Sequence, residues 1–163
     1  MDTNFNTMLK REIRTYAYLY MGAKKEVQAA GEDIDSGMKM LKSMNAIILI
    51  AFSLEAFFNH LGQKKIKHWK HFEKKLSPKE KLNLLAEHFS LPLDYSRRPM
   101  QSIKAIFDVR NLLAHGKTEN LQEFREGIVP TESVLELKSK WQNDCSFENS
   151  SRYLKDAAEI IEH

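Results

Sequence analysis

Apolar residues recur along the chain at intervals of three and four, the spacing of one face of an α-helix. A second helix is predicted from about Ser36 to Leu61, and its centre, residues 46–58, is apolar nearly all round. Such a helix is enclosed by others, so we expect it to be the central element. Before it, a long first helix is predicted, which Gly31 can end. Its apolar stripe consists of seven residues spaced alternately four and three apart: Leu9, Ile13, Tyr16, Tyr20, Ala23, Val27 and Ala30.

Signals for helix ends predict two helices in the middle of the chain. Ser77 is a capping serine, Pro78 stands at the first helical position and Glu80 follows three residues after the cap, so a third helix should run from Pro78 to about Phe89. Pro99 can open a fourth helix in the same way. The fourth helix is predicted to end near Gly116 and to carry an apolar stripe of Ile103, Ile106, Phe107 and Leu113.

The last third of the chain predicts two further helices, and no segment alternates apolar and polar residues over the length of a strand. We therefore expect an all-α protein, an antiparallel bundle of about five to six helices that forms a single domain over residues 1–163. The apolar positions of the last two helices are Val134, Leu137 and Trp141, then Leu154, Ala157, Ala158 and Ile161.

Composition narrows the class of protein. Cys145 is the only cysteine, which excludes an intrachain disulfide and a metal site built on several cysteines. The longest apolar run, Ala46–Phe52, is far shorter than the roughly 20 residues of a membrane span, and the polar N-terminus does not resemble a signal peptide. We expect a cytoplasmic protein without membrane contact. Gly-rich phosphate loops and nucleophile elbows are absent from the sequence, which disfavours ATPases, dehydrogenases and α/β-hydrolases.

Positive charge is concentrated between residues 63 and 81, where eight residues are basic and two acidic in a chain of net charge +3. This stretch can hold a polyanion, with bases stacking on the rings of Trp69 and Phe72 and phosphates on ammonium groups. A solvated connector and core anchoring of Trp69 and Phe72 are the alternatives. His60, His68 and His71 suggest a metal only weakly, because lysines surround them; we expect no metal and no cofactor. The candidate contacts to nucleic acid are Lys64, Lys65, Lys67, Trp69 and Lys70.

Arg110 breaks the apolar stripe of the fourth helix, seven residues after Ile103 and three after Phe107. A buried guanidinium needs an anionic partner: an internal carboxylate, a phosphate ligand or a subunit interface. Asn111 lies four residues before His115, so the amide and the imidazole share a helix face. Arginine binds phosphate oxygens and histidine moves protons near neutral pH, so this set can cleave RNA through its 2′-hydroxyl without a metal.

The phrase from Phe107 to Lys117 resembles the signature of the HEPN superfamily (higher eukaryotes and prokaryotes nucleotide-binding): Arg-x(4–6)-His, commonly with Asn after the Arg, at the end of a helix. Residues 51–59 resemble the second helix of that family, and residues 79–85 the helix often found between. The resemblance implies a homodimer in which two copies of Arg110, Asn111 and His115 meet in a cleft. Arg110 and His115 would be catalytic and Asn111 their positioner, with Glu55 or Asn59 as the supporting polar residue.

The same resemblance leaves two classes of function open. Many active members are metal-independent RNases, some of them toxins or antiphage effectors, so single-stranded RNA and an antitoxin or regulatory protein are the expected partners. Other members are inactive dimerisation or ligand-binding modules. A structural Glu55–Arg110 bridge would suit an inactive scaffold, and Arg110 could instead hold a small phosphate ligand in a nucleotide-binding module.

Overall fold

The structure, a computed structural model, describes residues 10–122 and 137–162, and within these ranges every regular element is a helix. The all-α prediction is confirmed. The described residues contain seven helices where five to six were predicted. The additional helix is α3, which is too short to show a periodic stripe, whereas α6 lies where the fifth helix was predicted. The helices are α1 (Thr15–Glu32), α2 (Ser36–Lys65), α3 (Trp69–Phe72), α4 (Pro78–His88), α5 (Met100–Ala114), α6 (Lys140–Asp144) and α7 (Phe147–Glu162).

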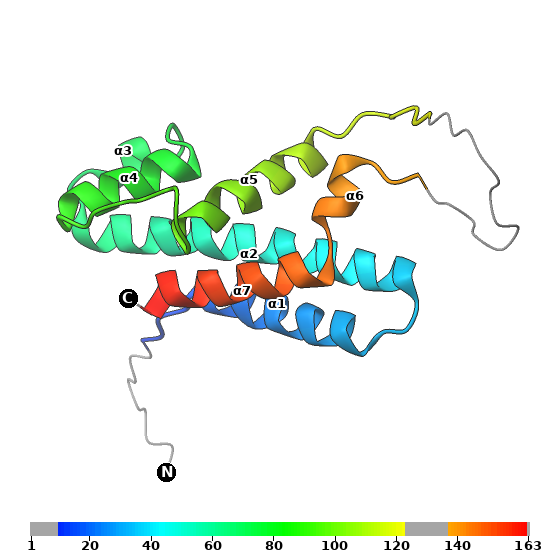
Figure 1. Cartoon of the computed structure of the whole chain (residues 1–163). Helices are drawn as coiled ribbons and strands as arrows, with labels where there is room; N and C mark the ends of the chain where they lie inside the picture. Colours follow the sequence, from blue (N-terminus) through cyan, green and yellow to red (C-terminus); the bar gives the residue numbers. More distant parts are fainter. Residues whose placement is uncertain (1–9, 123–136, 163) are drawn as a thin grey trace, which may run out of the picture.

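Helix α2 is central, as predicted. It contacts α1 and α7 on one side and α4 and α5 on the other (Figure 1). Helices α1 and α2 form an antiparallel hairpin, and α7 lies along both of them (Figure 1). The buried core draws mainly on α2, through Ile47, Ile50, Leu54, Phe57 and Phe58, with Ile103 and Ile106 of α5 and Tyr153 and Ala157 of α7.

Helix α2 has 30 residues and clear end signals. The Asp35 side chain accepts a hydrogen bond from the backbone N–H of Met38 at its start, and Lys64 and Lys65 stand in its last turn, where cations favour the helix dipole. Among the described residues, α2 is the one helix long and apolar enough to cross a membrane by length and composition. Core helices pass the same test, and α2 is packed on two sides by other helices.

The first helix begins later than its apolar stripe predicts. Leu9 lies outside the described residues, and Ile13 precedes α1 with 63% of its surface exposed. The stripe holds from Tyr16 onward, and Ala23 and Ala30 are fully buried. The apolar spacing alone predicts that the helix includes Ile13, but this side chain is exposed and does not pack in the core.

The segment from Gly62 to Leu76, which holds most of the basic stretch, is more ordered than a solvated connector. Helix α2 continues through Gly62 to Lys65, and after a left-handed residue, His68, the side chain of Trp69 folds back and is buried. A Cβ atom on Gly62 would lie 2.2 Å from the indole, so the glycine permits close packing here and does not end the helix.

The C-terminal region matches the prediction in part. Val134 lies outside the described residues, and Trp141 lies in the short helix α6. The final helix is present as α7. Its most buried side chains are Ser150, Tyr153, Asp156 and Ala157, while Leu154, Ala158 and Ile161 of the predicted stripe are half-buried at its edge.

Candidate functional site

Arg110 lies on α5 in the stripe that faces α2, after the buried side chains of Ile103, Ile106 and Phe107. Its guanidinium is not fully enclosed, and 30% of the side chain is exposed. The Nη2 atom donates to Oε2 of Glu55 on α2 at 3.3 Å. The sequence predicted an anionic partner for Arg110, and within one chain the structure provides it as the carboxylate of Glu55.

Glu55 has a second cationic partner that the sequence analysis missed. Lys81 of α4 donates from Nζ to Oε1 of Glu55 at 2.9 Å, and only 3% of the lysine side chain is exposed. One carboxylate, itself 25% exposed, is therefore shared between a buried ammonium and a partly exposed guanidinium. We call Glu55, Lys81 and Arg110 the charged cluster.

The signal for Lys81 was present in the sequence. On α4 the buried residues are Lys81, Leu82, Leu85 and Ala86, which is one helical stripe in which the first member is charged. Like Arg110, Lys81 is a charge in an apolar stripe and therefore needs an anionic partner. The basic stretch around Lys81 hid this signal, because a lysine among exposed lysines is expected to be solvated.

Asn111 and His115 lie on the exposed side of the same helix end. Nη1 of Arg110 donates to Oδ1 of Asn111 at 2.9 Å. Helix α5 ends at Ala114, and the backbone N–H of His115 caps it by donating to the carbonyl oxygen of Asn111 at 3.0 Å. Arg110, Asn111 and Glu55 are thus joined by contacts, whereas the exposed side chain of His115, five residues after Arg110, makes no hydrogen bond or ion pair with them among the described residues.

The other α2 residues near the charged cluster differ in their roles. Phe52 is 43% exposed, and its ring centroid lies 5.7 Å from Cζ of Arg110, a cation–π contact. Asn59, the alternative supporting residue, has a buried Oδ1 that accepts no hydrogen bond from the described residues. Of the two supporting candidates, Glu55 is therefore the residue that holds Arg110.

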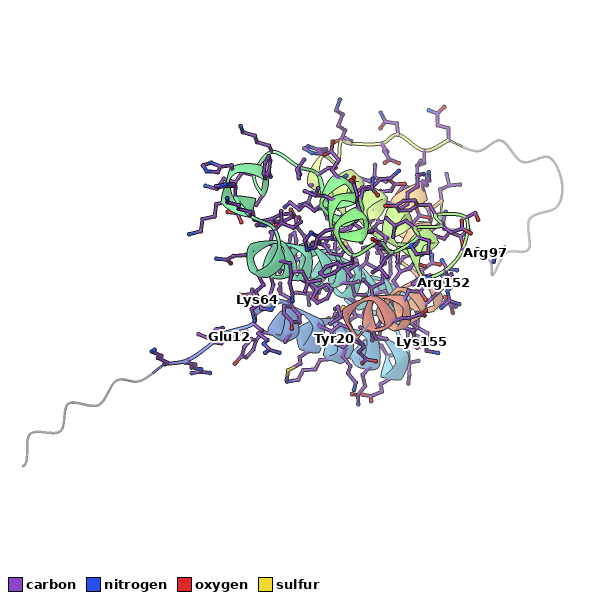
Figure 2. All side chains as sticks on the ribbon, turned by 90° about the vertical axis from the view of Figure 1, so that its left-hand side faces the viewer. Glu12, Tyr20, Lys64, Arg97, Arg152 and Lys155 are labelled. Atoms are coloured by element: carbon purple, nitrogen blue, oxygen red, sulfur yellow. The ribbon has the colours of Figure 1, made fainter. Side chains whose placement is uncertain are left out.

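The candidate nucleic-acid contacts divide into exposed lysines and one buried ring. Lys65, Lys67 and Lys70 are exposed. Lys64 pairs with Glu12 at 3.0 Å, and Figure 2 shows the two side chains together at one edge of the molecule. This hydrogen bond from Lys64, with a second from Arg14, lowers the pKa of the Glu12 carboxyl.

Trp69 was wrongly placed among the nucleic-acid contacts. Its side chain is 2% exposed and lies against Gly62, so no base can stack on it. Burying the large apolar surface of an indole is favourable in free energy, and this gain places Trp69 in the core although lysines flank it in the sequence. Core anchoring, the alternative weighed for Trp69 and Phe72, is confirmed for Trp69 and wrong for Phe72, which is 43% exposed.

The histidines and the cysteine show no additional reactive arrangement. In the described parts of the chain, no group of three or more His, Cys, Asp or Glu side chains is placed to hold a metal ion. Cys145 is fully buried, and burial together with the nearby Asp144 carboxylate raises the pKa of its thiol to about 11. A thiol with that pKa stays protonated at neutral pH, as expected for an inert cysteine.

A second charged contact, also missed from the sequence, joins α7 to the start of α5. Asp156 is 1% exposed and accepts two hydrogen bonds from Nε of Arg98 and one from its Nη2, the last at 2.5 Å. The hydroxyl of Ser102 also donates to Asp156. Because the carboxylate is enclosed and fully engaged, this contact fastens helices together and offers no open site.

Comparisons of the chain with known protein families, with curated proteins and with solved structures find no match.

Proposed function

We propose that this chain is a metal-independent endoribonuclease of HEPN type that acts as a homodimer, with Arg110 and His115 as its catalytic pair. The observation that carries the proposal is the state of Arg110: it is partly exposed, shares its carboxylate with Lys81 and precedes an exposed histidine at a helix end. A guanidinium with residual positive charge, followed five residues later by an imidazole, the side chain most often used as a general base, suits a phosphodiester.

The proposed reaction uses the ribose 2′-hydroxyl, which restricts it to RNA. His115 accepts the proton of this hydroxyl, and the oxygen attacks the adjacent phosphorus. Arg110 stabilises the negative charge that develops on the phosphate oxygens, while Asn111 holds the guanidinium in place through its side-chain oxygen. The P–O5′ bond breaks and the departing oxygen takes up a proton from water, which leaves a 2′,3′-cyclic phosphate and a free 5′-hydroxyl, while His115 returns its proton to the solvent.

The RNA strand is proposed to reach this site along the exposed lysines that precede α4. Lys65, Lys67 and Lys70 form no ion pair with a described carboxylate, so their positive charge is available to the RNA. Lys64 adds to it after giving up its pairing with Glu12. The exposed ring of Phe52 beside Arg110 takes over the stacking role first assigned to Trp69.

The test is cleavage of end-labelled single-stranded RNA in EDTA by the wild type, Arg110→Ala and His115→Ala. We expect the wild type to yield products with cyclic phosphate ends and each variant to lose at least about 100-fold in rate, the scale of a general acid–base contribution. DNA of the same sequence is the matched control and should stay intact. Absence of cleavage by the wild type, or equal cleavage by all three proteins, would overturn the proposal.

A second candidate function is a catalytically inactive dimerisation scaffold. The contact that favours it is the Glu55–Arg110 bridge inside one chain, which gives the arginine a structural partner without any ligand. Under this alternative, Arg110→Ala lowers thermal stability and the wild type shows no RNA turnover.

If the ribonuclease acts as a toxin, expression of the wild type should arrest cell growth, and a protein antagonist should relieve the arrest.

A further inference from the structure

The charged cluster contains one more cation than anion. Glu55 contributes one negative charge, and Lys81 and Arg110 contribute one positive charge each. Each cation uses its own carboxylate oxygen: Lys81 binds Oε1 at 2.9 Å and Arg110 binds Oε2 at 3.3 Å. The shorter contact belongs to the buried lysine, so the carboxylate is balanced first by Lys81.

Lys81 cannot itself contact a polymeric ligand. Its side chain is 3% exposed, whereas 30% of the Arg110 side chain is exposed. Any effect of the lysine on an anion outside the protein must therefore pass through Glu55 and Arg110. The guanidinium has five N–H groups, and the contacts with Glu55 and Asn111 use two of them.

We propose that Lys81 is a positioning residue that neutralises Glu55 and thereby leaves the charge of Arg110 available to a phosphate group. This inference rests on the proposed function in taking RNA as the natural source of that phosphate. Without Lys81, Glu55 and Arg110 form a closed pair of zero net charge, and an incoming phosphate must compete with the carboxylate. With Lys81, the phosphate meets a cluster of net positive charge.

The experiment compares RNA binding of five proteins as a function of salt: the wild type, Lys81→Met, Lys81→Arg, Glu55→Gln/Lys81→Met and Arg110→Ala. Cleavage is blocked by 2′-deoxy substitution of the oligonucleotide, and inorganic pyrophosphate is titrated in parallel by calorimetry. Lys79→Met is the matched control, because it removes the same charge from the exposed surface of α4, where Lys79 lies over the ring of Tyr95.

We expect Lys81→Met to weaken RNA binding about tenfold and to reduce the salt slope by about 0.7, the value of one phosphate contact on a single strand. Lys81→Arg should bind like the wild type. The double variant should recover wild-type binding because it removes the carboxylate along with the lysine. A purely structural lysine would change stability without this recovery, and Lys79→Met should change affinity less than threefold.

Two results would overturn the inference. In the first, Lys81→Met binds RNA as tightly as the wild type although Arg110→Ala binds it weakly. In the second, the double variant folds but binds RNA as weakly as Arg110→Ala. If Lys81→Met does not fold, the double variant decides alone. A wild type that binds neither RNA nor pyrophosphate overturns it as well. Binding that follows the expected order without cleavage of all-ribose RNA would reject the ribonuclease and support the role of Lys81.

Discussion

At the scale of single residues, charged side chains in apolar stripes are the most informative positions of this chain. Arg110, Lys81 and Asp156 each occupy such a position, and each is paired with an opposite charge. This outcome follows from the high cost of an unpaired buried charge. The sequence identifies that a partner must exist, while the identity of the partner depends on which helices the fold brings together.

Cys145 gives a prediction at this scale. Because the pKa of its buried thiol is raised to about 11, the reactive thiolate is scarce in the native protein below pH 10. We expect no labelling by iodoacetamide at pH 8 under native conditions and complete labelling in guanidinium chloride, read by mass spectrometry. A thiol that reacts at the same rate in both conditions would contradict the burial of this side chain.

At the scale of the element, a capping signal located the start of α4, whereas α2 continues past its predicted end at Leu61 to Lys65. The Ser77–Glu80 capping box is present in both directions, and α4 begins at Pro78 as predicted. Such a box involves residues within one turn, so sequence is sufficient to predict it. Gly62 is different, since its role depends on Trp69, seven residues later and outside the helix.

The packing of Gly62 against Trp69 predicts the effect of a methyl group. Gly62→Ala stabilises the helix by about 1 kcal/mol through helix propensity. However, a Cβ atom would lie 2.2 Å from the indole and force the ring to move. Such overpacking costs about 3 kcal/mol. We expect a net loss of about 2 kcal/mol in the free energy of unfolding, measured by urea denaturation.

Gly116→Ala is the control for this substitution. The nearest atoms to a Cβ at Gly116 are backbone oxygens at 3.5 Å, an ordinary contact. Its free energy of unfolding should stay within about 0.5 kcal/mol of the wild-type value. If the two alanine variants are equally stable, the close packing of Trp69 on Gly62 is wrong.

At the scale of the whole molecule, contacts between distant segments hold the site helices in place. The loop before α5 and the C-terminal helix α7 are joined by Arg98 and Asp156, which are 58 residues apart in sequence. Ser53 of α2 donates to the carbonyl oxygen of Tyr16 on α1 at 2.8 Å, which adds a polar link to the hairpin. The first link ties the start of α5, which carries Arg110, to α7, and the second ties α2, which carries Glu55, to α1.

Arg98→Ala tests this connection. The substitution leaves the enclosed carboxylate of Asp156 with the Ser102 hydroxyl but without its cation, and a buried charge that loses its partner destabilises the folded state. We expect this loss of stability in thermal or chemical unfolding. Arg98→Ala/Asp156→Asn should recover part of it because no charge is then left enclosed. A double variant less stable than the single one would contradict this account.

The all-α class, the central position of α2, the capped start of α4 and the need of Arg110 for an anion could be predicted from sequence, because periodicity, caps and a charge in an apolar stripe are local properties. The sharing of Glu55 between Lys81 and Arg110, the enclosure of Trp69 and the contact of Asp156 with Arg98 depend on how the helices pack. These contacts join different helices or a helix and a loop, and the free energy of burying each group depends on neighbours that sequence spacing does not specify.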